Sequence, residues 1–387
     1  MGFWDSLKRP AQDSTYRLER LVDSLLREEA GKGGVHIVCD IDKTYLETEF
    51  ESLIRMARIA FEAASDKVTV AGASEVLQLA RWGDVSASLP TSGEFPRCLH
   101  FVSSSPPQLR TVLAEKMMMD GLDWTSDTFK NQVYNLRMGR MDLLRQHVAY
   151  KSLALLNLVA KAEDEATFYL IGDNAESDAY IYTGIKLLLD GRLNASTYQA
   201  YLEAAGVESK VAQSLAALAK VRKRVGVAAV LIRRVPGYAM VEQSPLTDSV
   251  QTFDDFFQAA LLLMAHGLIG SEHLWPLARS FHNHHGMTQR QIAHSLQAVS
   301  AAPVLTQLRQ AAAEALQRLT VATRSSSSAS ALERSLGVTP ARLNQLTGSD
   351  ILRHARLWQQ RMAAAKDKRE DKSRRQAAKS TNTNRVK

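Results

Sequence analysis

The feature that most restricts the fold of this chain is a regular alternation of short apolar runs with longer segments of helical periodicity. Five apolar runs have the length of strands: residues 35–39, 98–102, 132–136, 168–171 and 227–232. Segments with apolar residues at helical spacing lie between or after them, for example residues 109–118, 151–160 and 253–266. Strands that alternate with helices in this way predict an α/β fold with a five-stranded parallel sheet and helices on both faces.

Two stretches are longer than the connections of a minimal sheet and have helical patterns. Residues 45–83 separate the first strand from the second, and residues 191–224 precede the last strand, so both are predicted to be helical insertions. Apolar spacing also predicts an N-terminal helix over residues 15–29, and after Gly270 only helical patterns continue. The sequence therefore predicts four parts: an N-terminal helical segment at 1–30, an α/β domain at 31–270, a helical unit at 271–365 and a tail at 366–387.

The net charge of +7 is carried by the end of the chain rather than by its body. Residues 366–387 hold nine basic and three acidic side chains, which accounts for six of the seven net positive charges. A nearly neutral body argues against a nucleic-acid-binding fold. The tail is too polar to fold alone, so we expect it to be disordered.

The sequence gives no sign of a membrane span or a disulfide framework. Its most apolar stretch, residues 259–265, is far shorter than the roughly 18 residues that a span requires. The N-terminus lacks the basic start and apolar stretch of a secretory signal. The two cysteines, Cys39 and Cys98, lie in strand-like runs and suit a reducing compartment. We expect a cytoplasmic protein whose membrane contact, where it occurs, is peripheral.

Two carboxylates follow the first predicted strand, in the segment Asp40-Ile41-Asp42-Lys43-Thr44. Because side chains alternate along an extended chain, Asp40 and Asp42 can both face the crevice beyond the strand end. In open α/β sheets this crevice is where ligands bind. Mg²⁺ prefers oxygen ligands of this kind, so the pair predicts a magnesium site.

Three further motifs follow in chain order, each at a predicted strand end or helix start. Ser103 and Ser104 close the second strand and can donate hydrogen bonds to a phosphoryl oxygen, while Lys151 opens a helix with a compact positive charge. Asp173 and Asp178 follow the fourth strand and add two carboxylates. Taken singly, these residues also fit a turn, a solvated lysine and a helix cap. Their ordered combination is what favours a phosphate site.

This order of motifs resembles the haloacid dehalogenase (HAD) superfamily, whose members share a Rossmann-like fold. Over about residues 35–240 the chain is also similar to the catalytic domain of actin-patch-type phosphatidate phosphatases. The similarity rests on the segments Val102-Ser-Ser-Ser-Pro106, Leu136-Arg137, Ile171-Gly-Asp-Asn-Ala-Glu-Ser-Asp178 with Ile181-Tyr182, and Leu231-Ile-Arg-Arg-Val235. The chain departs from that family at Lys43, where an aspartate is usual, in the helical stretch 191–224, and in its C-terminal unit.

The resemblance implies a role for each candidate site residue. Asp40 would attack phosphorus and become an aspartyl phosphate, and Asp42 would protonate the leaving oxygen and later activate water. Mg²⁺ would be held by Asp40, Asp173 and the backbone carbonyl of Asp42. Asp178 would order the water shell of the ion, with Asn174 as a helper. The phosphoryl group would be positioned by Thr44, Ser103, Ser104 and Lys151.

The resemblance favours a magnesium-dependent phosphatase that acts on phosphatidate or a related phospholipid headgroup at a membrane surface. Two alternatives stay open at the level of sequence. The same chemistry could act on a soluble phosphometabolite or a phosphoprotein, because the departures at Lys43 and elsewhere bear on the substrate. The chain could also be a non-catalytic binding or scaffold protein whose C-terminal helices engage a partner.

Overall fold

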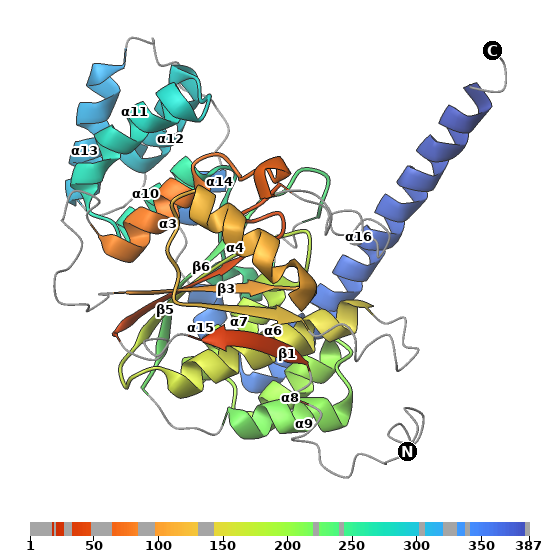
Figure 1. Ribbon diagram of the computed structural model, residues 1–387. Helices are drawn as coiled ribbons and strands as arrows, with labels where there is room; N and C mark the ends of the chain where they lie inside the picture. The colour runs from red at the N-terminus through yellow and green to blue at the C-terminus, as the bar shows by residue number, and fades with distance from the viewer. Residues whose placement is uncertain are drawn as a thin grey trace.

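The computed structural model describes residues 18, 21–26, 33–47, 64–83, 97–130, 143–219, 224–239, 244–301, 306–319, 331–336 and 341–383. They form an α/β body with a group of helices at one end and a long C-terminal helix that extends away from it (Figure 1).

A seven-stranded sheet forms the centre of the α/β body. In chain order its strands are β1 (Val22–Leu26), β2 (Val35–Asp40), β3 (Cys98–Ser103), β4 (Ser126–Lys130), β5 (Thr167–Asp173), β6 (Gly226–Arg233) and β7 (Gln251–Phe253). Their order across the sheet is β1-β4-β3-β2-β5-β6-β7, and every neighbouring pair is parallel except β1 with β4. The predicted α/β class is confirmed. The prediction of five strands, all parallel, is wrong, because the sheet is larger and mixed.

A search for apolar runs does not find the additional strands, and the reasons are physical. β1 lies within the helix predicted at 15–29, so that prediction is wrong over residues 22–26. Its apolar residues, Val22, Leu25 and Leu26, are spaced in a way that also fits a helix, and its centre is polar, with Ser24 Oγ 3.0 Å from Thr128 Oγ1 of β4. β4 is buried yet largely polar, and β7 has three residues. The strand expected at 132–136 lies outside the described residues.

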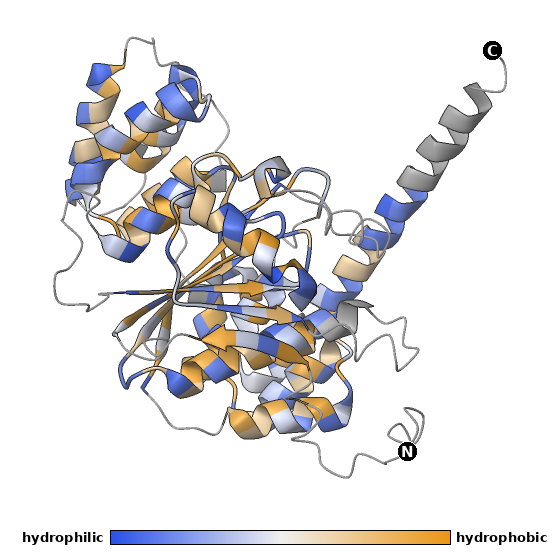
Figure 2. Ribbon diagram, in the orientation of Figure 1, coloured by the Kyte–Doolittle hydropathy of each residue, from blue (hydrophilic) through white to orange (hydrophobic). Residues whose placement is uncertain are grey.

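Helices cover both faces of the sheet, as predicted (Figure 1). One face carries α3 (Ala73–Trp82), α4 (Arg110–Met119) and α10 (Phe256–Ala265), and the other carries α6 (Leu143–Lys161), α7 (Asp178–Leu189), α8 (Ala195–Ala204) and α9 (Ser209–Leu218). Strand side chains alternate between two cores, for instance Ile37 in the first and Val38 in the second. Figure 2 shows the apolar strands between these helical layers.

Where residues are described, the helical predictions agree with the structure except over 15–29, where residues 22–26 form strand β1. α8 and α9 form the insertion expected at 191–224, while of the insertion at 45–83 the structure describes α3 and a short turn. Residues 48–63 lie outside the described part. Short 3₁₀ helices complete the list: η3 (Ala64–Asp66), η4 (Pro107–Leu109), η5 (Pro245–Ser249) and η6 (Ser271–His273).

Beyond Gly270 the described residues are helical. The helices are α11 (Leu274–His284), α12 (Gln289–Ala301), α13 (Thr306–Arg318), α14 (Ala331–Leu336), α15 (Ala341–Asn344) and α16 (Gly348–Thr383). α16 is anchored by buried residues of its first half, including Trp358, whose ring meets Tyr180 of α7 edge-on at 5.6 Å.

The second half of α16 differs from the disordered tail expected at 366–387, because the helix continues to Thr383. A helix that is already nucleated extends at little cost, and this segment is rich in alanine, lysine and arginine, which favour helices. Among the described helices, none combines the length and apolarity needed to cross a bilayer.

Candidate active site

Three buried carboxylates meet where the central strands end. Asp40 is the last residue of β2, Asp173 is the last residue of the neighbouring β5, and Asp178 begins α7. One carboxylate oxygen of each lies within 4.8 Å of the other two, and all three side chains are fully buried. β2 lies between β3 and β5, so this point is also where the chain order of the strands reverses, the usual ligand crevice of such sheets.

Lys151 of α6 joins two of these carboxylates. Its ammonium group lies 2.8 Å from Asp40 Oδ1 and 2.5 Å from Asp178 Oδ1, and its side chain is fully buried. Glu176 Oε2 lies at 3.4 Å from the same nitrogen. The sequence predicted Lys151 at a helix start, whereas α6 begins at Leu143 and places Lys151 in its third turn. Lys151 is therefore a counter-ion held between the strand ends.

Thr44 lies at the centre of the turn that follows β2. Its hydroxyl donates towards Asp173 Oδ2 at 3.2 Å and Asp40 Oδ2 at 3.4 Å, so it connects the two strand-end carboxylates. Lys43, just before it, has a left-handed backbone (φ 59°), and its ammonium group donates to the Tyr238 hydroxyl at 2.7 Å. The residue that departs from the resembled family thus contacts Tyr238 of the loop that follows β6.

The Asp42 side chain faces the serine segment that follows β3 rather than the carboxylate cluster. Its Oδ2 accepts hydrogen bonds from Ser103 at 3.1 Å and from Ser105 at 2.9 Å. Its Oδ1 is buried and has no hydrogen-bond partner among the described residues. The sequence singled out Ser103 and Ser104, whereas the structure brings Ser103 and Ser105 to Asp42.

Ser104 belongs to a separate polar group at the edge of the site. Its hydroxyl lies 3.0 Å from Glu176 Oε2 and 2.7 Å from His147 Nδ1. Neither Glu176 nor His147 was predicted as a site residue, although Glu176 lies inside the segment that carries Asp173 and Asp178. His147 had no motif to mark it, because it reaches the site only through the packing of α6.

Asn174 forms hydrogen bonds with the loop that follows β6. Its amide oxygen accepts from the Val235 backbone at 2.7 Å, and its amide nitrogen donates to the Tyr238 carbonyl at 3.2 Å. Arg233, the last residue of β6, donates to the Lys43 carbonyl at 2.7 Å and pairs with Glu47. Tyr238 is a further site neighbour that the sequence did not indicate, whereas Arg233 belongs to the segment Leu231-Ile-Arg-Arg-Val235 that carries the family resemblance.

Burial disfavours ionisation of the carboxyl groups in this site. It raises the pKa of Asp42 and of Asp173 to about 7, and raises that of Asp40 and Asp178 although Lys151 opposes the shift. Burial also disfavours the charge on Lys151, yet Asp178 and Asp40 hold its pKa above the usual value. A single lysine therefore faces more negative charge than it can balance.

The donor set fits a divalent cation. Lys151 occupies one oxygen of Asp40 and one of Asp178, and the other Asp178 oxygen is buried with no hydrogen-bond partner among the described residues. Oxygen ligands in a cluster with excess negative charge suit a hard divalent ion. The carboxylates that could hold it are Asp40, Asp173 and Asp178.

Gly172 is required where β5 meets α7. A Cβ at this position would lie 2.4 Å from Asp178 Oδ2 and 2.8 Å from the Tyr182 ring. We expect Gly172→Ala to displace Asp178 and to lower stability by about 1–3 kcal/mol. Thermal unfolding measures this effect.

Gly226→Ala is the matched control, since a Cβ at that position on the adjacent strand β6 meets nothing within 4 Å. Equal unfolding temperatures of Gly172→Ala and the control would show that Asp178 is not displaced by the added Cβ.

The family comparison gives the class of this α/β body with its buried carboxylate and lysine cluster, which is a catalytic domain of the phosphoric monoester hydrolases. Residues 35–196 match the family model described as phosphatidate phosphatase APP1, catalytic domain. This segment is therefore a phosphatidate phosphatase-like catalytic domain, and the sequence resemblance is confirmed. Phosphatases of this family generally depend on a metal ion, in keeping with the carboxylate cluster.

The matched segment covers less than half of the 387 residues, but it contains Asp40, Lys151, Asp173 and Asp178. It ends at the start of α8, before β6, β7 and the C-terminal helices. Comparisons with curated proteins and with solved structures gave no match. The hydrolase family match favours the enzyme over the non-catalytic scaffold considered from the sequence.

Proposed function

We propose that this chain is a magnesium-dependent phosphatidate phosphatase of the HAD type that acts through an aspartyl phosphate on Asp40. The observation that carries the proposal is the position of Asp40: it ends the central strand, contacts Lys151 at 2.8 Å, and lies in a cluster with Asp173 and Asp178. The family match supports the phosphatidate headgroup as the substrate.

In the proposed mechanism, Asp40 attacks phosphorus in line and its carboxylate becomes the acyl phosphate. Asp42 gives a proton to the leaving oxygen and afterwards takes one from the water that hydrolyses the intermediate. A pKa of about 7 suits both roles near neutral pH, and burial is its main cause. The unpartnered Oδ1 is the oxygen free to carry this proton, while Ser103 and Ser105 hold Oδ2.

Mg²⁺ held by Asp40, Asp173 and Asp178, with the Asp42 carbonyl, would neutralise charge shared between the nucleophile and the phosphoryl group. Lys151 supplies a fixed positive charge 2.8 Å from Asp40 Oδ1, and the Thr44 hydroxyl connects Asp40 and Asp173. Positioning and charge neutralisation are most of what phosphoryl transfer needs.

The substrate assignment is tested by a phosphate-release panel. We expect release from phosphatidate in mixed micelles and vesicles at a rate at least about tenfold above that from soluble sugar or nucleotide phosphates, with activity abolished by EDTA and restored by Mg²⁺. Faster release from a soluble ester would reject the lipid substrate and retain the reaction. Release that EDTA does not alter would reject the metal dependence.

Helix α16 supports contact with an anionic bilayer. The Arg369 guanidinium lies over the Tyr238 ring at 3.5 Å, and the Tyr238 hydroxyl accepts from Lys43 at 2.7 Å, so the helix passes beside the turn that carries Asp42. Exposed basic side chains occur on the same stretch at Arg361, Lys366 and Lys368. A basic residue near an anionic surface contributes about 1 kcal/mol.

We expect the triple change Arg361→Gln, Lys366→Gln and Lys368→Gln to weaken binding to vesicles that contain phosphatidate by about tenfold or more, and to lower activity on vesicles more than on p-nitrophenyl phosphate. Cosedimentation with vesicles measures the binding. The charge-matched control replaces three exposed basic residues on other helices: Lys210, Arg290 and Arg309. Equal loss in both triple variants would remove α16 from the proposal.

A further inference from the structure

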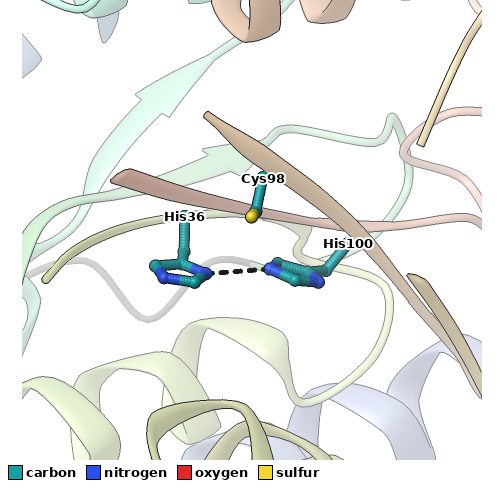
Figure 3. A group of neighbouring side chains, drawn as sticks. All are labelled: His36, Cys98 and His100. Atoms are coloured by element: carbon teal, nitrogen blue, oxygen red, sulfur yellow. Dashed lines mark hydrogen bonds between the residues drawn. The ribbon is translucent and has the colours of Figure 1, made fainter. Parts of the chain in front are cut away.

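A second cluster of ligand-type side chains lies inside the sheet, at the other end of β2 and β3 from Asp40. His36 faces Cys98 in the strand register, and His100 is two residues further along β3. One nitrogen or sulfur of each lies within 4.8 Å of the other two, and each side chain is at most 1% exposed. Figure 3 shows the imidazole rings end to end with the Cys98 sulfur beside the line between them. His36 precedes Asp40 by four residues, about 13 Å along a strand, so this cluster is separate from the active site.

Hydrogen bonds fix the nitrogens that face the centre of the cluster. His36 Nε2 lies 3.1 Å from the Gly33 carbonyl, which can only accept, so the proton of a neutral ring is on Nε2 and Nδ1 is bare. Nδ1 faces His100 Nε2 at 3.0 Å, and His100 Nδ1 lies 2.7 Å from Ser126 Oγ. Each outer nitrogen thus has an oxygen partner, and the two inner nitrogens face each other. Metal-binding histidines are held in this way.

The surroundings of the two rings are largely apolar and favour their neutral forms. The His36 ring stacks on Phe168 at 4.7 Å, and Val38 and Val102 belong to the same apolar core. Burial lowers the pKa of His36 to about 4 and that of His100 below its usual value. Neutral imidazole is the form of the histidine ring that binds metal ions.

We propose that His36 Nδ1, His100 Nε2 and Cys98 Sγ bind one cuprous ion. A thiolate with two imidazoles is a donor set of copper proteins, and thiolate ligands select Cu⁺. Charge decides between Cu⁺ and Zn²⁺: the thiolate neutralises a monovalent ion, whereas a divalent ion would leave a net positive charge in an apolar core. Three donors of this kind also suffice for Cu⁺, while structural Zn²⁺ sites take four.

Binding of Cu⁺ requires no redox step, and each proton that the ion displaces can be accounted for. The Cys98 thiol proton passes to solvent as its sulfur binds the ion. The proton on His100 Nε2 is replaced by the ion, and Nδ1 is protonated and donates to Ser126 Oγ. The site links β2 to β3, the strands that end at Asp40 and Ser103, so we expect bound copper to stabilise the sheet without entering the phosphatase reaction.

The test is Cu⁺ binding by the full-length chain, reduced and free of oxygen, in competition with bicinchoninate. We expect about one equivalent bound, an X-ray absorption edge with sulfur and nitrogen ligands, and a rise of several degrees in Tm. Cys98→Ala should lower the affinity at least about tenfold and lose the Tm rise. Cys39→Ala is the matched control, since Cys39 is the other buried cysteine and its thiol donates to the Asp40 carbonyl; it should retain both.

Three results would overturn the proposal: no copper retained against the chelator, equal affinity in Cys98→Ala, or tighter binding of Zn²⁺ than of Cu⁺. Should Cys98→Ala fail to fold, the sulfur ligand in the wild-type absorption spectrum still decides the matter. None of these readouts uses phosphatase activity, so the result is independent of the proposed function.

Discussion

We expect Asp40→Asn to abolish phosphate release, by at least roughly 10⁴-fold in kcat, while the protein stays folded. The amide keeps the shape of the side chain but cannot attack phosphorus. Stability moves in the opposite direction from activity: burial raises the pKa of Asp40, so ionising it has a cost in the fold that the neutral amide avoids. We therefore expect a Tm equal to or above that of the wild type in the absence of Mg²⁺. Phosphate release from phosphatidate micelles and thermal unfolding measure the two quantities.

The matched control is Asp127→Asn. Asp127 is a buried carboxylate of β4 that pairs with Arg110 at 2.7 Å, outside the carboxylate cluster. It should retain most of the activity, since it touches none of the reacting groups. Residual turnover of a few per cent in Asp40→Asn, or an equal loss in the control, would remove the nucleophile role from Asp40.

The strand-end residues of the site could be located from the sequence because they follow apolar runs. Asp40, Ser103 and Asp173 each end a strand whose apolar residues mark it, and parallel strands bring their ends to one edge. Lys151 was located only through the order of the motifs, since a single lysine on a helix carries no periodic signal. What the sequence located is thus the edge of the sheet at which these groups gather.

The remaining neighbours depend on loops and packing that no local pattern encodes. Glu176 and His147 meet Ser104 from different elements, and Tyr238 reaches Lys43 across 195 positions of the chain. β4 was not predicted for a related reason. Its side chains are polar, and they can be buried because partners such as Arg110 form hydrogen bonds with them. Burial of polar groups follows from tertiary contacts, so a search for apolar runs passes over them.

Lys151→Met should produce the largest loss of stability among single changes in the site. The lysine is the fully buried counter-ion of Asp40 and Asp178, and methionine fills the same space without charge. Removing one partner of a buried ion pair costs about 3–5 kcal/mol, because the other charges stay buried. Activity should fall at least about 100-fold, since the positive charge beside the nucleophile is lost.

The stability of Lys151→Met relative to the wild type should also depend on pH, in a direction that the pKa shifts determine. In the wild type the pKa of Lys151 is raised, so the ammonium remains charged at every pH below its usual value and its contribution is present throughout. In Lys151→Met the carboxyls of Asp40 and Asp178 retain protons, and a carboxyl with a raised pKa loses its stabilising effect as pH rises through that value. The difference in unfolding free energy between the wild type and Lys151→Met should therefore widen as the pH rises above the usual range of a carboxyl pKa.

A divalent ion should reduce the difference in unfolding free energy between the wild type and Lys151→Met, because it supplies the positive charge that methionine lacks. Denaturant unfolding at several pH values, with Mg²⁺ and with EDTA, measures both effects. Lys186→Met is the control: Lys186 pairs with Asp190 near the surface of α7, where an ion pair contributes about 1 kcal/mol or less. A difference that is constant with pH and insensitive to Mg²⁺ would mean that the three carboxylates do not share one electrostatic site, and the catalytic account of Asp40 would lose its basis.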